Sequence, residues 1–123
     1  MEDCDYLFEC PDPDGEELAR VIAGLFPAQT RFTCQIVGEG ALQLNVHWVA
    51  MRFATTARRM TMTFAIAPAA LARYRALPAR LRSRSFAVLH AYAEAALGSL
   101  EERYAQGEHI GRDMVIDLGD EFA

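Results

Sequence analysis

The sequence predicts an α+β domain in which an antiparallel three-stranded meander is covered on one face by helices, with an edge strand added at each terminus. Apolar and polar residues alternate through three consecutive segments in the middle of the chain, which is the pattern of half-buried strands. Apolar residues recur at helical spacing before and after these segments. A length of 123 residues without an internal repeat or a low-complexity linker fits a single domain, with residues 1–13 as an acidic N-terminal arm. The predicted order of elements is therefore (β)-α-β-β-β-α-α-(β).

The acidic arm and the segment after it are expected to form a short edge strand and a first helix. Tyr6, Phe8 and Cys10 alternate with other residues, and the prolines that follow end the strand. The helix is expected to begin at Asp14, a favourable N-cap, and to end before Pro27. Its apolar face consists of Leu18, Val21, Ile22, Leu25 and Phe26.

The three central strands are predicted from a two-residue period over residues 30–37, 41–49 and 59–66. Residues 38–40, which include two glycines, supply the turn of the first hairpin. An antiparallel sheet that is covered on one side leaves its other side exposed. That outer face would display Arg31, Thr33, Gln35, Gln43, Asn45, His47, Arg59, Thr61 and Thr63.

Two helices and a last strand are expected after the meander. Pro68 and Pro78 each suit the first turn of a helix, which predicts a short helix over about residues 68–77 and a long helix over about residues 79–105. Alternation over residues 113–119 predicts a final edge strand. An apolar stripe on the long helix should pack across the inner face of the sheet, and it consists of Phe86, Leu89, Ala93, Ala96, Leu97, Leu100 and Tyr104.

Charge is segregated along the chain, whose formal net charge is −5. Residues 1–17 carry eight acids and no base, residues 40–93 carry eight arginines and no acid, and residues 94–123 carry eight acids and two arginines. Five arginines lie close together, at Arg73, Arg75, Arg80, Arg82 and Arg84, and we call them the arginine cluster. Two interpretations stay open. Either the acidic ends lie over these arginines within one fold, or the arginines contact a partner or its phosphate groups.

The order α-β-β-β-α, with basic residues where the last helix begins, resembles that of the double-stranded-RNA-binding domain. The resemblance implies that Arg80 and Arg84, which are four residues apart and would share a helix face, contact backbone phosphates. The lysines that this family carries at that helix start, and its Gly-Pro-x-His loop, are absent here, and Glu39 lies in the corresponding turn. A sequence pI of about 5.1 also opposes nonspecific nucleic-acid binding. Nucleic acid is therefore the alternative partner and not the preferred one.

The three cysteines, Cys4, Cys10 and Cys34, are expected to be free thiols, because the chain shows no secretory signal and a cytoplasmic protein keeps its thiols reduced. The spacing of Cys4 and Cys10 matches no zinc motif, and no segment is apolar for long enough to span a membrane. The three histidines belong to no catalytic motif, and the chain lacks a phosphate-binding loop. We therefore expect no metal, no cofactor and no enzymatic activity.

The preferred hypothesis is a small, non-enzymatic cytoplasmic protein that acts through protein–protein contact, including contact with a second copy of itself through the sheet face or an edge strand. The candidate interface on the sheet consists of Thr33, Gln35, Gln43, Asn45, His47, Thr61 and Thr63. The first alternative is a nucleic-acid backbone binder that uses the arginine cluster. The second alternative is a small-ligand binder with a pocket between the sheet and the long helix, around Trp48, Met62 and Tyr92.

Overall fold

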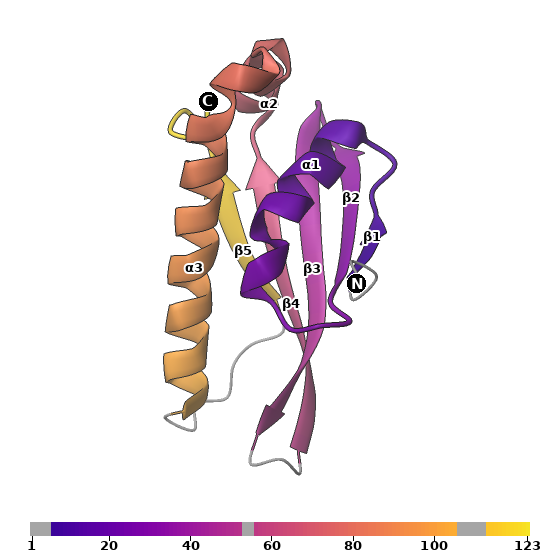
Figure 1. The fold of residues 1–123 in the computed structure, drawn as a ribbon, viewed down its shortest axis with the longest axis vertical. Helices are drawn as coiled ribbons and strands as arrows, with labels where there is room; N and C mark the ends of the chain where they lie inside the picture. Colours follow the sequence, from indigo (N-terminus) through magenta and orange to yellow (C-terminus); the bar gives the residue numbers. More distant parts are fainter. Residues whose placement is uncertain (1–5, 53–55, 106–112) are drawn as a thin grey trace.

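The computed structural model of the chain describes residues 6–52, 56–105 and 113–123, with side chains described outside residues 50–58 and 103–113. The predicted α+β class and the order of the elements are confirmed (Figure 1). The elements are β1 (Leu7–Glu9), α1 (Pro13–Ile22), the 3₁₀ turn η2 (Ala23–Leu25), β2 (Arg31–Val37), β3 (Ala41–Arg52), β4 (Thr56–Ile66), α2 (Pro68–Ala76), the 3₁₀ turn η3 (Ala79–Leu81), α3 (Ser83–Ala105) and β5 (Asp113–Leu118).

The sheet has the strand order β1-β2-β3-β4-β5, and only its centre is antiparallel. β1 runs parallel to β2, and β5 runs parallel to β4, so the sheet is mixed where the sequence predicted an antiparallel one. The reason lies in the connections. α1 separates β1 from β2, while α2 and α3 separate β4 from β5. Each helical crossover returns the chain to the end of the sheet where the previous strand began, so the next strand runs in the same direction.

The core lies between the sheet and the layer formed by α1 and α3, which lie on the same face of the sheet and contact each other (Figure 1). Leu18 and Ile22 of α1 and Leu89 and Ala93 of α3 are fully buried there. The inward side chains of the strands meet them, and those with no more than 9% exposure are Phe32, Cys34, Leu42, Leu44, Val46, Trp48, Met60, Met62, Phe64, Ile66 and Leu118. The predicted inward face of the three central strands is thus confirmed, except that Ile36 is 49% exposed near the end of β2.

Two helices begin at residues other than those predicted. α1 begins with Pro13, so Asp12 and not Asp14 occupies the N-cap position. Proline is favoured at the first helical position because its fixed φ suits the helix and its missing N–H is not needed there. α3 begins at Ser83, since the preceding residues form the separate turn η3. Arg80 in η3 and Arg84 in α3 therefore do not share one continuous helix.

Cys10 and Cys34 form a disulfide, so the expectation of free thiols is wrong for these two residues. The parallel register of β1 and β2 places Cys10, just after β1, beside Cys34, with their Cα atoms 5.0 Å apart. α1 crosses directly over this bond at Gly15, where an added Cβ atom would lie 2.6 Å from the Cys34 Sγ atom. Only glycine permits this approach without a shift of the helix. Cys4 lies outside the described residues.

Candidate functional site

The face of the sheet opposite α1 and α3, which we call the outer face, carries the seven residues of the predicted interface. They alternate with the core residues along β2, β3 and β4, as Thr33, Gln35, Gln43, Asn45, His47, Thr61 and Thr63. Among the described outward side chains of these three strands, Arg31 and Arg59 are the only arginines, and there is no aspartate or glutamate. The described acids of this face lie on the outer strands, Glu9 on β1 and Asp117 on β5. The centre of the outer face is therefore polar and free of carboxylates.

Hydrogen bonds between adjacent strands hold several of these side chains in place. The Thr63 hydroxyl donates to Asn45 Oδ1 over 2.8 Å, and the Gln35 amide donates to Gln43 Oε1 over 3.1 Å. Thr63 is only 9% exposed, so little water can reach its hydroxyl. Without Asn45, this hydroxyl would lose its hydrogen-bond acceptor at a nearly buried position, which is unfavourable. Side chains that are already fixed lose less conformational entropy when a partner docks on them.

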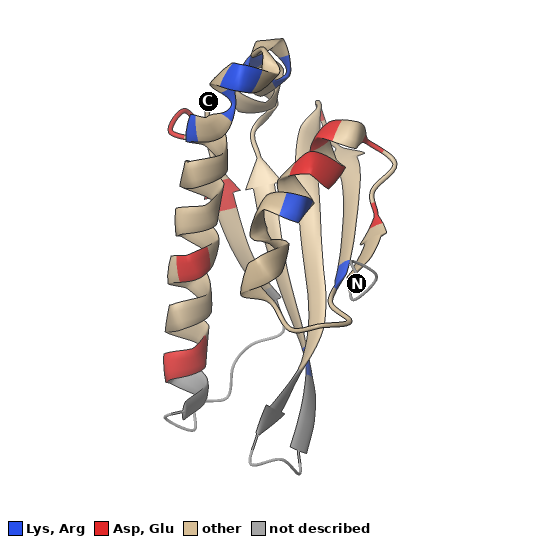
Figure 2. Cartoon of the chain, in the orientation of Figure 1, with Lys and Arg blue, Asp and Glu red and all other residues tan. Residues whose placement is uncertain are grey.

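Two members of the arginine cluster bind acids from the start of α1. Arg75 contacts both carboxylate oxygens of Asp12, at 2.8 and 3.2 Å, and reaches Asp14 at 2.6 Å. Arg82 binds Glu17 at 2.7 Å and Asp14 at 3.2 Å. Figure 2 shows the basic α2 and η3 at the same end of the molecule as the acidic start of α1. Of the two interpretations of the charge pattern, the structure supports neutralisation within the fold for these arginines.

A buried tyrosine extends this network. Tyr74 of α2 is fully buried, its hydroxyl donates to the Glu17 carboxylate, and the Arg82 guanidinium lies 4.5 Å above the centre of its ring. A third member of the cluster, Arg73, binds Asp120 near the C-terminus at 2.9 Å. The α1, α2 and C-terminal segments are thus joined by ionic and hydrogen-bonded contacts that involve three of the five clustered arginines.

Arg80 and Arg84 are exposed, and neither forms an ion pair with a residue in the described part of the chain. They belong to different elements, η3 and α3. The single basic surface that a phosphate backbone would need is therefore divided into neutralised arginines at the α1–α2 contact and two separate exposed ones.

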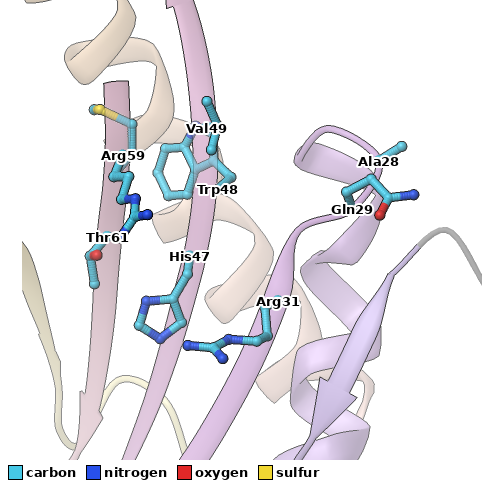
Figure 3. Close-up of a pocket in the computed structure, with 9 residues that line it drawn as sticks. Ala28, Gln29, Arg31, His47, Trp48, Val49, Arg59 and Thr61 are labelled. Carbon is cyan, nitrogen blue, oxygen red and sulfur yellow. The ribbon is translucent and has the colours of Figure 1, made fainter. Parts of the chain in front are cut away.

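A pocket of about 440 Å³ lies at one end of the sheet, beside the turn that precedes β2 (Figure 3). Trp48 lines it, as the ligand hypothesis expects, but Met62 is fully buried in the core and Tyr92 lies 37% exposed on α3, bonded to Glu121. This pocket is therefore not the one predicted between the sheet and the long helix. Its lining consists of Ala28, Gln29, Arg31, His47, Trp48, Val49, Arg59, Met60 and Thr61.

Sequence reasoning placed Arg31, His47 and Arg59 on one face but did not bring them together as a site. The register does so: Arg31 is opposite His47, and Arg59 is one outward position beyond Thr61, which is the other neighbour of His47. On β2, the strand that also carries Arg31, the Thr33 hydroxyl oxygen lies 3.4 Å from His47 Nε2. The two-residue period in the sequence shows that these residues share a face. It does not show which of them are neighbours, because that depends on the register of the strands.

The described residues contain no group of three or more His, Cys, Asp and Glu side chains that could hold a metal ion. Among the helices that the structure describes, none combines the length and the apolar character that crossing a bilayer requires. His90 is partly buried on α3, and His109 lies outside the described residues.

A family model described as "Protein of unknown function (DUF3022)" matches residues 15–119. The chain belongs to the DUF3022 family. The matched region runs from within α1 to the residue after β5, so it contains β2, β3 and β4 with all the described residues that line the pocket. β1, Cys10 and Asp12 precede it. No curated protein matches the chain, and no solved structure does.

Proposed function

We propose that the protein acts by protein–protein contact, and that the outer face of its sheet is the contact surface for a second copy of the chain. The observation that carries the proposal is the hydrogen-bonded set of uncharged polar side chains on β2, β3 and β4, on the face of the sheet opposite α1 and α3. Removing an amide or a hydroxyl from water at an interface costs less free energy than removing a charged group does. This face is therefore suited to a contact that forms and dissociates.

A second copy fits this face because side-chain amides and hydroxyls both donate and accept hydrogen bonds. Two identical faces related by a twofold axis can then satisfy each other. The described outward side chains of the sheet include two arginines, Arg31 and Arg59, and two acids, Glu9 and Asp117. The described part of this face is thus nearly neutral although the chain carries a formal net charge of −5. Two copies repel each other less here than at the surfaces that hold the excess acids.

The nucleic-acid alternative has less support from the contacts of the arginine cluster. A phosphate would have to displace carboxylates from Arg73, Arg75 and Arg82. Arg80 and Arg84 offer two exposed guanidiniums on separate elements, whereas backbone binding draws its affinity from many phosphate contacts at once.

Gln43→Glu tests the proposed contact. It adds a negative charge to the centre of the outer face and keeps an oxygen that accepts the hydrogen bond from Gln35. Ala91→Glu adds the same charge to the exposed side of α3 and is the matched control. Light scattering after size exclusion should show wild type and Ala91→Glu approaching twice the 13.7 kDa chain mass as concentration rises. Because like charges would face each other across the twofold axis, the dimer of Gln43→Glu should dissociate about tenfold more readily.

If wild type has the mass of one chain at every concentration, self-association is contradicted. If Gln43→Glu and Ala91→Glu weaken the dimer equally, the contact does not lie on the outer face. The nucleic-acid alternative would be supported instead if wild type is retained on heparin at low salt and the double variant Arg80→Ala with Arg84→Ala is not.

The cytoplasmic location stays a prediction, and the Cys10–Cys34 disulfide weighs against it, because such bonds are rare where thiols are kept reduced. Alkylation of free thiols in intact cells, followed by mass spectrometry of the purified chain, distinguishes the two cases. Alkylated Cys10 and Cys34 would support the cytoplasm, and an intact disulfide would contradict it.

A further inference from the structure

The pocket at the end of the outer face gathers basic groups from three strands. Arg31 of β2 lies opposite His47 of β3, and Thr61 of β4 lies opposite His47 on its other side. Arg59 is the next outward residue of β4 beyond Thr61. Figure 3 shows the side chains of Arg31 and Arg59 extending toward the His47 ring from two sides. The two guanidiniums thus border one space although they come from different strands.

Among the residues that the structure describes, no carboxylate lines this pocket. Arg31 has Glu9 nearby on β1, at 3.8 Å, and Arg59 forms no ion pair with a residue that the structure describes. Arg75 and Arg82, by comparison, hold their acids at 2.6–3.2 Å. Arg31 and Arg59 lie on the two strands that flank β3, so an anion placed between their guanidiniums would be attracted by both. These guanidiniums therefore keep much of their capacity to bind a ligand.

The remaining wall of the pocket is mainly apolar and comes from Ala28, Trp48, Val49 and Met60. The Trp48 ring packs against the Phe26 ring with their centres 5.1 Å apart, which fixes the position of the indole. A volume of about 440 Å³ falls within the range of small-molecule sites and exceeds what a bare oxyanion fills. The pocket accordingly offers contacts to an anionic group and to an apolar group in the same ligand.

We propose that this pocket binds a small molecule in which a carboxylate or phosphate group is joined to an apolar or aromatic body. The anionic group lies between Arg31 and Arg59, whose planar guanidiniums match the geometry of oxyanions, and the body lies on the apolar wall. Gln29, His47 and Thr61 supply further hydrogen-bonding atoms. The proposal does not depend on self-association, since it concerns a small ligand at one end of the face.

Trp48 provides a direct readout, because it is the one tryptophan of the chain and lines the pocket. Its emission is followed while phenyl phosphate, benzoate or neutral benzyl alcohol is added to the full chain. Saturable binding is expected for the two aromatic anions, and weaker binding for inorganic phosphate, which lacks the apolar body. Arg31→Gln with Arg59→Gln should weaken phenyl phosphate binding by about tenfold or more, because each removed guanidinium makes charge-assisted hydrogen bonds.

The matched control is Arg80→Gln with Arg84→Gln, which removes two exposed arginines outside the pocket and the same net charge. Binding by the control should stay within about twofold of wild type, given that surface charges beyond a Debye length are screened. If the pocket double variant unfolds, Arg59→Gln alone takes its place. The proposal is overturned if neither aromatic anion gives a saturable change in wild type, if benzyl alcohol binds as tightly as phenyl phosphate, or if both double variants lose affinity equally.

Discussion

Tyr74 should make the stability of the protein fall steeply at alkaline pH. Burial raises the pKa of Tyr74 above its usual value of about 10, and the hydrogen bond to the Glu17 carboxylate raises it further. In the unfolded chain the same phenol ionises near pH 10. Because the folded state holds this proton while the unfolded state releases it, the free energy of unfolding is unaffected by Tyr74 below about pH 10 and decreases as pH rises above it.

As long as the Tyr74 phenol stays protonated in the folded state, the decrease in the free energy of unfolding depends only on its ionisation in the unfolded chain. At pH 11 it amounts to about 1.4 kcal/mol relative to neutral pH. Tyr74→Phe removes this ionisable group and keeps the ring on which Arg82 stacks. At neutral pH the variant should be less stable by about 1 kcal/mol, because it lacks the hydrogen bond to Glu17.

Urea unfolding of wild type and Tyr74→Phe at pH 8 and at pH 11 measures both quantities. The free energy of unfolding of wild type minus that of Tyr74→Phe should fall by about 1.4 kcal/mol from pH 8 to pH 11, from about +1 to about −0.4 kcal/mol, since every other titrating group is common to both. If that difference is the same at the two pH values, Tyr74 is not held protonated by burial and Glu17, and the reasoning is refuted.

The contact between α1 and the disulfide gives two further predictions. Gly15→Ala should lower the free energy of unfolding by about 1–3 kcal/mol, because its Cβ would lie 2.6 Å from Cys34 Sγ. Gly24→Ala, whose Cβ meets no atom within 4 Å, is the control, and equal thermal stability of the two variants would contradict this. Reducing the Cys10–Cys34 bond should cost about 3 kcal/mol, because the bond joins residues 24 apart in the sequence. Cys10→Ser should unfold at the Tm of the reduced wild type, and a wild-type Tm that dithiothreitol leaves unchanged would disprove the estimate.

The sequence was sufficient for the elements whose pattern is local. Alternation in β2, β3 and β4 predicted both the core face and the outer face, because a strand buries every second side chain against its own layer. The stripe on α3 was equally readable, and Leu89, Ala93 and Leu100 are buried as predicted. Tyr104 of that stripe lies outside the described side chains.

The features that the sequence did not predict depend on how distant segments align. Cys10 and Cys34 were each recognised as lying in a strand-like alternation, but their bond requires β1 to pair in parallel with β2. Alternation says which side a residue faces and nothing about which strand lies beside it. The same limit applies to Arg75 and Asp12, whose contact depends on α1 and α2 meeting at one end of the sheet.

Arg31 and Arg59 differ from Arg75 and Arg82 in how far the fold neutralises their charge, and the density of arginines along the chain does not predict this difference. The arginine cluster looked like an anion-binding surface because its members are close in sequence, yet Arg75 and Arg82 sit among carboxylates that α1 brings to them. Arg31 and Arg59 are far apart in sequence and meet only through the register of the sheet, on a face where the described acids lie on the outer strands. Whether a basic residue can bind a foreign anion depends on how much of its charge the fold already neutralises. By that criterion, Arg31 and Arg59 keep charge that a ligand could use, as the exposed Arg80 and Arg84 do, and of these four residues Arg31 and Arg59 line the pocket.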